Sequence, residues 1–208
     1  GRDRPRSPFF NQLNTRWLDH LTAAGIDPDK VDFVLMTHLH GDHIGWNTHW
    51  VDGVWQPLFK HARYICSAAG LAAWERDPAR QTLMEDSLRP VMAAGLLDTI
   101  DLTQQNTFAD CLTYFPTPGH TQDHASVILH SDGAWGIFSG DLMHSTLQVS
   151  QPELSSCFCE NLEQAEQQRR RMMDWAADHQ ALWFSSHFAE SSAGYITRHH
   201  GHYRWQYA

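Results

Sequence analysis

The chain has 208 residues, of which 42% are hydrophobic and 19% charged, values that suit one globular domain and argue against disorder. Its formal net charge of −9, with histidine counted as neutral, argues against nucleic acid as the main partner, because phosphate binding needs a positive surface. No apolar run approaches the ~20 residues of a membrane span and none resembles a signal peptide, so we expect a cytoplasmic protein without a membrane partner.

The first predicted elements are a helix and a buried strand. Apolar residues at helical spacing predict a helix over residues 11–24, which Gly25 would end. A short apolar run predicts a buried strand over residues 31–36. This strand leads directly into residues 38–43, whose sequence is His-Leu-His-Gly-Asp-His. Four metal-ligand residue types therefore lie where a strand gives way to a loop, a common place for catalytic groups.

The spacing within residues 38–43 indicates a metal site. Side chains at positions i and i+2 of an extended segment point to the same side, so His38 and His40 can share one ion. Asp42 and His43 follow the turn of the chain and could serve a second ion nearby. Zinc accepts imidazole nitrogen and carboxylate oxygen at roughly 2.0–2.2 Å. A lone histidine would be read as a polar loop residue, but four such residues favour metal binding.

The remaining elements predict a layered α/β sandwich. Residues 46–59 are rich in tryptophan and are predicted to form a long loop. Helices are predicted over residues 68–76 and 80–94, and another should begin after the capping residue Asn161. Further strands are predicted at residues 62–67, 112–115, 125–130, 135–138, 181–185 and 194–197.

Three more candidate ligands follow predicted strands. His120, Asp141 and His187 each come shortly after an apolar run, and the first two directly follow a glycine. Glycine lets the backbone approach an ion closely. A Gly-Asp pair alone is often only a turn, but the same setting occurs three times. This recurrence predicts that the three residues complete the metal site.

Other histidines and the cysteines have simpler interpretations. The four cysteines are predicted to be free thiols, because the Cys-x-Cys pair at residues 157–159 has no partner cluster. The histidine cluster at residues 199–202 is predicted to be a polar strand or tail rather than an adventitious metal site. His124 is predicted to pack or to contact a ligand.

The order His-x-His-x-Asp-His, Gly-His, Gly-Asp and a last His resembles the metallo-β-lactamase-fold hydrolases, from about residue 9 to the C-terminal region. Residues 37–47 and 52–57 look most like the lactonase and organophosphate-hydrolase branch. The resemblance implies an αββα sandwich that binds two divalent metal ions. Zinc is favoured, with manganese, cobalt and iron as alternatives, because imidazole and carboxylate suit several metals. It implies that one ion is held by His38, His40 and His120, the second by Asp42, His43 and His187, and that Asp141 bridges both.

The resemblance also implies a reaction. A hydroxide bridging the two metals would open a lactone, with an N-acyl homoserine lactone favoured and an organophosphate triester as the alternative. Asp42 would also orient the hydroxide. His144 replaces a tyrosine that some lactonases have three residues after the bridging aspartate, and it could protonate the leaving group or be a polar loop residue. Trp46 and Phe188 could wall the substrate pocket, although aromatic residues more often pack in a core.

Two other classes remain open, namely an iron-dependent redox enzyme of the same fold and a non-catalytic metal-binding fragment. The di-iron members need a flavin module, whose phosphate-binding loop is missing from this sequence. Relatives usually place several strands before the helix that this chain begins with. We therefore predict a single domain over residues 1–208 that is N-terminally incomplete, whose exposed sheet edge would favour a homodimer.

Overall fold

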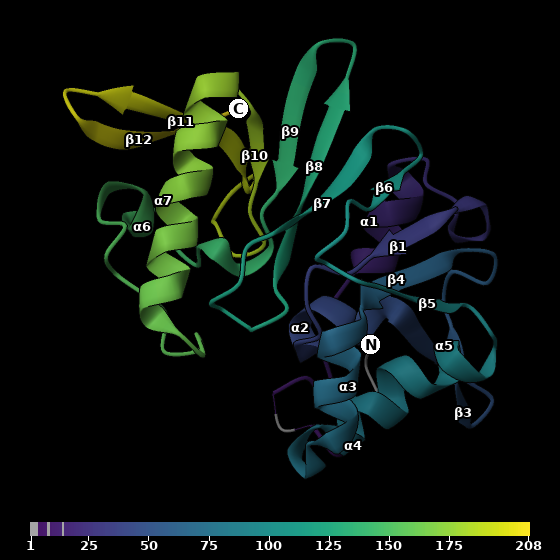
Figure 1. The fold of residues 1–208 in the computed structure, drawn as a ribbon. Coiled ribbons are helices and arrows are strands. Elements are labelled where there is room, and N and C mark those ends of the chain that lie inside the picture. Colours follow the sequence, from purple (N-terminus) through teal and green to yellow (C-terminus); the bar gives the residue numbers. More distant parts are fainter. Residues whose placement is uncertain (1–3, 8, 14) are drawn as a thin grey trace. The chain divides into compact units, whose positions relative to one another are not determined.

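The chain folds into two compact units, residues 1–100 and 101–208. The computed structural model describes residues 4–7, 9–13 and 15–208. Both units combine helices with β-sheet (Figure 1), as the predicted α/β class requires. The prediction of one domain over residues 1–208 stays a prediction.

The first unit is built on a parallel sheet of three strands in the order β1-β4-β5. Its strands are β1 (Phe33–Leu35), β4 (Arg63–Ser67) and β5 (Leu97–Ile100). Its α-helices are α1 (Trp17–Ala23), α2 (Gly41–Ile44), α3 (Ala68–Arg76), α4 (Gln81–Leu83) and α5 (Arg89–Ala93). A π-helical turn at Met84–Leu88 joins α4 to α5, and 3-10 turns lie at Pro28–Lys30, Gly45–Asn47 and Pro78–Arg80.

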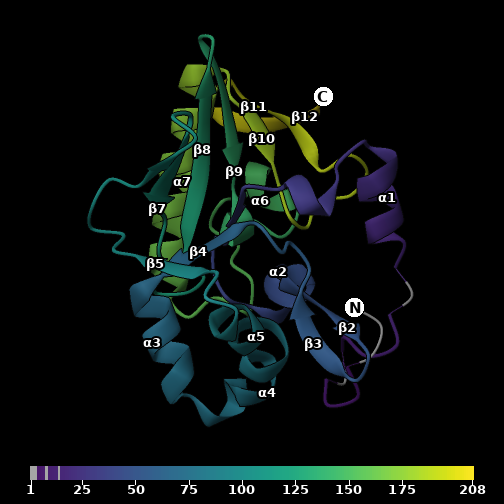
Figure 2. The same cartoon turned by 90° about the vertical axis from the view of Figure 1, so that its right-hand side faces the viewer.

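The prediction of a long loop over residues 46–59 is wrong, because most of this segment is a β-hairpin (Figure 2). Strands β2 (Thr48–Val51) and β3 (Val54–Pro57) pair antiparallel. Asp52 and Gly53 form the turn with φ angles of 49° and 87°, the conformation that Asp-Gly supplies in two-residue hairpins. The rings of Trp50 and Trp55 lie opposite each other with centroids 5.1 Å apart, so the tryptophans stabilise the hairpin.

Tyr64 fixes both ends of this hairpin segment. Its ring is fully buried in β4, and its hydroxyl donates to the carbonyl oxygen of Asn47 at 3.0 Å. The same hydroxyl accepts the backbone N–H of Phe59 at 2.9 Å. Burial raises the pKa of Tyr64 to about 12, so the hydroxyl keeps the proton that it donates.

The helices in the structure of the first unit agree with the predicted helices to different degrees. Helix α3 has the predicted bounds, with Ser67 as its N-cap accepting from the N–H of Gly70. The helix predicted over residues 80–94 is broken into α4, the π-helical turn and α5, and Pro90 stands in the first turn of α5. The helix predicted over residues 11–24 begins only at Trp17. Strand β5 was not predicted.

The second unit is built on a seven-stranded sheet in the order β12-β11-β10-β9-β8-β7-β6 (Figure 1). Its strands are β6 (Thr107–Phe108), β7 (Leu112–Pro116), β8 (Ala125–Ser131), β9 (Ala134–Phe138), β10 (Leu182–Phe184), β11 (Ala193–His199) and β12 (His202–Tyr207). A 3-10 turn at Gly140–Leu142 and the short helix α6 (Leu147–Ser150) lie between β9 and the long helix α7 (Leu162–His179). Strands β6 and β12 and helix α6 were not predicted.

Helix α7 covers one face of this sheet. Asn161 caps it, because its side chain accepts the N–H of Gln164 at 3.0 Å, as predicted. The helix buries an apolar stripe that includes Met172 and Met173, and these join a core cluster with Ile137 and Trp183 of the sheet. Neither α7 nor any other helix in the described residues is long and apolar enough to cross a membrane.

Candidate metal centre

The first unit carries four of the predicted ligands directly after β1. The imidazoles of His38 and His40 come together, with Nε2 of His38 3.1 Å from Nδ1 of His40. His38 is 1% exposed, and its other nitrogen, Nδ1, lies 3.1 Å from the hydroxyl of Thr37. The hydroxyl therefore fixes the ring so that Nε2 is turned toward His40.

Asp42 and His43 lie in the first turn of α2, which begins at Gly41. Nε2 of His43 lies 3.5 Å from Oδ2 of Asp42. The ring of His43 also lies beside the ring of His38, with centroids 4.2 Å apart. The change from strand to helix at Gly41 thus gathers all four side chains within one short segment.

The second unit carries the other three predicted ligands at one edge of its sheet. Strands β9 and β10 are parallel, so the loops after them leave the sheet at the same edge. Strand β8 is antiparallel to both β7 and β9, so the β7–β8 loop lies at that edge as well. These three loops carry His120, Asp141 and His187, together with His144.

Three imidazoles converge on one carboxylate oxygen in this unit. Oδ2 of Asp141 lies 3.2 Å from Nε2 of His120, 3.2 Å from Nε2 of His187 and 3.3 Å from Nε2 of His144. Two ligand atoms that bind one tetrahedral ion at ~2.0 Å are ~3.3 Å apart, which matches these distances and the His38–His40 distance. One oxygen has two lone pairs and cannot accept three N–H bonds. The donor set therefore fits divalent metal ions better than a hydrogen-bond cluster.

The backbone of Asp141 is held by the buried side chain of His124. Nε2 of His124 accepts the N–H of Asp141 at 3.0 Å. Its Nδ1 lies 3.1 Å from the carbonyl oxygen of Thr117, and a carbonyl can only accept, so Nδ1 carries the proton. His124 is therefore neutral and positions the carboxylate-bearing residue, in agreement with the predicted contact to a ligand.

The loop that carries His120 is closed by the N-terminus of α7. The N–H groups of Glu160 and Asn161 donate to the carbonyl oxygens of His120 and Gly119, at 3.0 and 2.9 Å. Gly119 has a φ angle of 137°, and a Cβ atom there would lie 2.3 Å from the backbone nitrogen of Ala165. Only glycine allows this close approach of loop and helix.

The segment that carries His144 is held by Gln148 and Arg169. The backbone N–H of His144 donates to Oε1 of Gln148 at 2.5 Å. The buried guanidinium of Arg169 donates to the carbonyl oxygens of Leu142 and Leu154, both at 2.9 Å, and also to that of Pro152. Burial lowers the pKa of Arg169, because it disfavours the charged form. The hydrogen bonds to these carbonyl oxygens offset part of the cost of burying the charge.

The predicted substrate residues lie in packed surroundings. Trp46 is half-buried and stacks on Trp17 with ring centroids 4.8 Å apart. Phe188 is 5% exposed in the core of the second unit, where its ring contacts Trp205 edge-on. Both rings contact other aromatic side chains, and a role of either residue in binding substrate stays a prediction.

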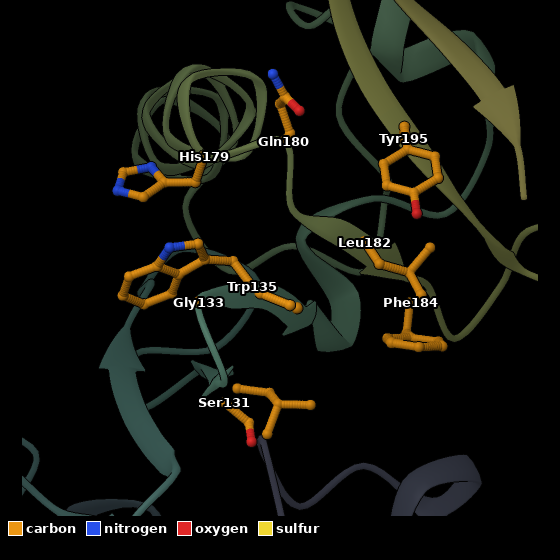
Figure 3. A pocket seen from close by; sticks show the side chains of 11 residues that line it. Ser131, Gly133, Trp135, His179, Gln180, Leu182, Phe184 and Tyr195 are labelled. Atoms are coloured by element: carbon orange, nitrogen blue, oxygen red, sulfur yellow. The ribbon is translucent and has the colours of Figure 1, made fainter.

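A cavity of about 470 Å³ lies on the sheet of the second unit. Figure 3 shows Trp135 and His179 on one side of it and Leu182, Phe184 and Tyr195 on the other. None of the predicted ligands, nor His144 or Phe188, lines this cavity, so it is separate from the group around Asp141.

Comparison with solved structures shows what fold the chain has. The structure of AbOPH, a hydrolase in the beta-lactamase superfamily, matches with a TM-score of 0.83 at 24% identity, covering 96% of this chain and 72% of AbOPH. AidC, a dizinc quorum-quenching lactonase, matches with a TM-score of 0.78 at 20% identity, covering 93% and 69%. A probable metal-dependent hydrolase from Staphylococcus aureus matches with 0.78 at 16% identity, covering 94% and 70%. These matches confirm the predicted α/β metallo-β-lactamase fold.

Comparison of the sequence shows the family. None of the curated protein sequences compared with the chain matches it significantly. The family model of the metallo-beta-lactamase superfamily, however, matches residues 5–181. This range contains the described segments that carry six of the seven predicted ligands, all except His187. Because the match extends over most of its length, the chain belongs to the metallo-beta-lactamase superfamily.

Proposed function

We propose that this protein is a dinuclear metal-dependent hydrolase that opens a lactone, with N-acyl homoserine lactones as the favoured substrate class. The observation that carries the proposal is the convergence of three imidazoles on Oδ2 of Asp141. Two of these imidazoles, His120 and His187, are assigned to different ions in the proposed site, so Asp141 lies where it could contact both ions.

The ligand assignment divides the seven residues between two ions. The resemblance to the family supports one ion on His38, His40 and His120, a second on Asp42, His43 and His187, and Asp141 as the bridge. When bound, two divalent ions would lower the pKa of a nearby water molecule and polarise the carbonyl or phosphoryl oxygen of the substrate. Zinc is the favoured metal, because the donor set is rich in imidazole.

Two side chains have proposed roles in moving protons. Asp42 is the more exposed of the two candidate carboxylates, with 39% of its side chain exposed against 3% for Asp141. It can therefore orient an incoming water molecule as well as bind metal. His144 lies 3.3 Å from Asp141 with 19% of its side chain exposed. An imidazole at that place can donate a proton to the alkoxide that leaves when the lactone opens.

The substrate class rests on similarity. AidC, whose fold this chain shares, is a quorum-quenching lactonase that was solved with N-hexanoyl-L-homoserine, its product. An organophosphate triester is the competing substrate, because the same activated water could attack phosphorus. We also propose that Trp46 contributes to the substrate pocket, because it comes two residues after the end of α2, the helix that carries Asp42 and His43.

Metal analysis combined with a substrate panel tests this proposal. The purified protein would be loaded with zinc, manganese, cobalt or iron, and its metal content would be measured by mass spectrometry. Each form would then be assayed with N-acyl homoserine lactones of several acyl lengths and with aryl phosphotriesters. Two zinc ions per chain with lactone turnover would support the proposal. Turnover confined to phosphotriesters would favour the alternative, and bound iron without hydrolysis would favour a redox enzyme.

A further inference from the structure

We propose that Cys159 is a positioning residue for His120, because its sulfur accepts a hydrogen bond from Nδ1–H and so leaves Nε2 as the ligand atom. This inference rests on the proposed metal site but adds a residue that the sequence pattern of the family does not contain.

The contact lies on the side of the His120 ring that faces away from Asp141. Sγ of Cys159 is 3.7 Å from Nδ1 of His120, within the range of a hydrogen bond to sulfur. The other ring nitrogen, Nε2, is 3.2 Å from Oδ2 of Asp141. His120 is 2% exposed, so water has little access to Nδ1. The thiol therefore occupies the place where ligating histidines have an acceptor.

The tautomer of His120 decides the direction of this bond. A neutral imidazole carries its one proton on either Nδ1 or Nε2. If Nε2 is to bind a metal ion, the proton must be on Nδ1, which then donates to the sulfur of Cys159. A thiol is a weaker acceptor than the carboxylate or carbonyl usually found at this place, so its position must be well fixed to be effective.

The backbone around Cys159 supplies this fixed position. Its own N–H donates to the carbonyl oxygen of Ser156 at 3.1 Å. The next two residues, Glu160 and Asn161, donate to the His120 loop. The carboxylate of Glu160 also accepts the N–H of Gln122 at 2.9 Å. These bonds lie on both sides of His120 and hold the thiol against one edge of its ring.

The simpler alternative is that Cys159 only fills space, as many half-buried thiols do. Three variants separate the two roles. Cys159→Ala removes the acceptor, whereas Cys159→Ser keeps one at nearly the same place. Cys157→Ala is the matched control, because this second cysteine of the same Cys-x-Cys segment is exposed.

The first measurement is the Nδ1–H proton of His120 in zinc-loaded protein, read from ¹H–¹⁵N spectra of the labelled imidazoles. We expect this proton to exchange slowly with water in the wild type, in Cys159→Ser and in Cys157→Ala. We expect faster exchange in Cys159→Ala, because the proton has lost its sulfur acceptor. The second measurement is zinc affinity by competition with a chelator. Loss of the acceptor should weaken zinc binding about 10- to 100-fold, and serine should restore most of it.

The outcomes separate this inference from the proposed function. If Cys159→Ala keeps the wild-type exchange rate of the His120 Nδ1–H and the wild-type zinc affinity and loses only thermal stability, Cys159 is a packing residue and the inference is wrong. Equal losses in Cys159→Ser and Cys159→Ala, or any loss in Cys157→Ala, would also overturn it. If the wild type binds zinc but opens no lactone, the proposed function fails, but the zinc affinities of the variants still decide the role of Cys159.

Discussion

His144 lies as close to Asp141 as His120 and His187 do, although the family pattern assigns it no ligand role. Its ring is stacked on the ring of His187, with centroids 5.1 Å apart and an interplanar angle of 8°. We propose that it donates a proton to the leaving group, and the alternative is a polar loop residue that only supports the metal site. The two roles differ in what the protein loses when the imidazole is removed.

We expect His144→Ala to lower kcat on lactones about 100-fold while the protein still binds two ions, because general acid catalysis contributes ~10²–10⁴-fold. Steady-state kinetics on protein whose metal content has been measured would check this. The reference variant is His120→Ala, which should lose metal. A His144→Ala protein that holds fewer ions than the wild type would show that His144 is a ligand instead.

His124 affects the site through the backbone of Asp141. We expect His124→Leu to lower the free energy of unfolding by about 1–3 kcal/mol, because the buried N–H of Asp141 loses its acceptor and the buried Thr117 loses one of its partners. Urea unfolding of metal-free protein measures this loss without any contribution from bound metal. An unchanged midpoint would mean that the bond from Asp141 to His124 contributes little to stability.

The sequence could predict which residues are candidates for the chemistry but not how each one is held. The strand-end setting of His120 and Asp141 depends on local sequence, so the pattern could find both. The bonds to His124 and Cys159 join segments 17 and 39 residues apart, and no local pattern records them. The one sequence signal for a role of His124 is its position four residues after His120.

Among the elements, the contact between the β7–β8 loop and α7 allows a sharp test at Gly119. We expect Gly119→Ala to lower the free energy of unfolding by about 3 kcal/mol or more, because the added Cβ would collide with the backbone of Ala165. Gly133→Ala is the matched control, since Gly133 also has a positive φ angle, 78°, but has no atom within 4 Å of the added Cβ. The control should lose only ~1–2 kcal/mol from backbone strain.

Thermal and urea unfolding of the two glycine variants would give the comparison. Equal losses at both positions would show that backbone strain alone is responsible. The packing of α7 against Gly119 would then contribute nothing measurable.

Arg169 connects α7 to the segment between β9 and α6. We expect Arg169→Met to lower the free energy of unfolding by about 2–3 kcal/mol, because the buried carbonyl oxygens of Leu142 and Pro152 lose a donor and that of Leu154 keeps only Gln148. The loss is smaller than the sum of three bonds, since methionine also avoids the cost of burying a charge. The control is Arg170→Met on the exposed side of α7, which should change stability by less than about 0.5 kcal/mol.

The elements that the sequence predicted well are those with local signals. Helix α7 has a capping residue and a regular apolar stripe, and both are visible in the sequence. The two hairpins that were not predicted also have a sequence signal, namely a residue followed by glycine at the turn. These pairs are Asp52-Gly53 and His200-Gly201, and all four residues have positive φ angles in the structure. An Asx-Gly pair is a recognised turn sequence, so β2 and β3 could have been found. His-Gly is a weaker signal, and β12 required the tertiary context.

At the scale of the whole molecule, each unit has its own core. The buried cluster of the first unit is built around Tyr64 and Leu88, and that of the second around Trp183 and Met172. The predicted ligands are shared between the units, four in residues 1–100 and three in residues 101–208. The cytoplasmic location and the homodimer stay predictions.

This division of ligands predicts that bound metal makes the two units unfold together. If each proposed ion takes ligands from both units, zinc must stabilise both at once, by about 4 kcal/mol at a free concentration 1,000 times its Kd. Hydrogen exchange with and without zinc would measure the effect, using peptides around His38 in one unit and Asp141 in the other. We expect slower exchange in both sets of peptides at the same zinc concentration. Protection confined to one unit would contradict the proposed ligand assignment, because each ion would then be held within that unit.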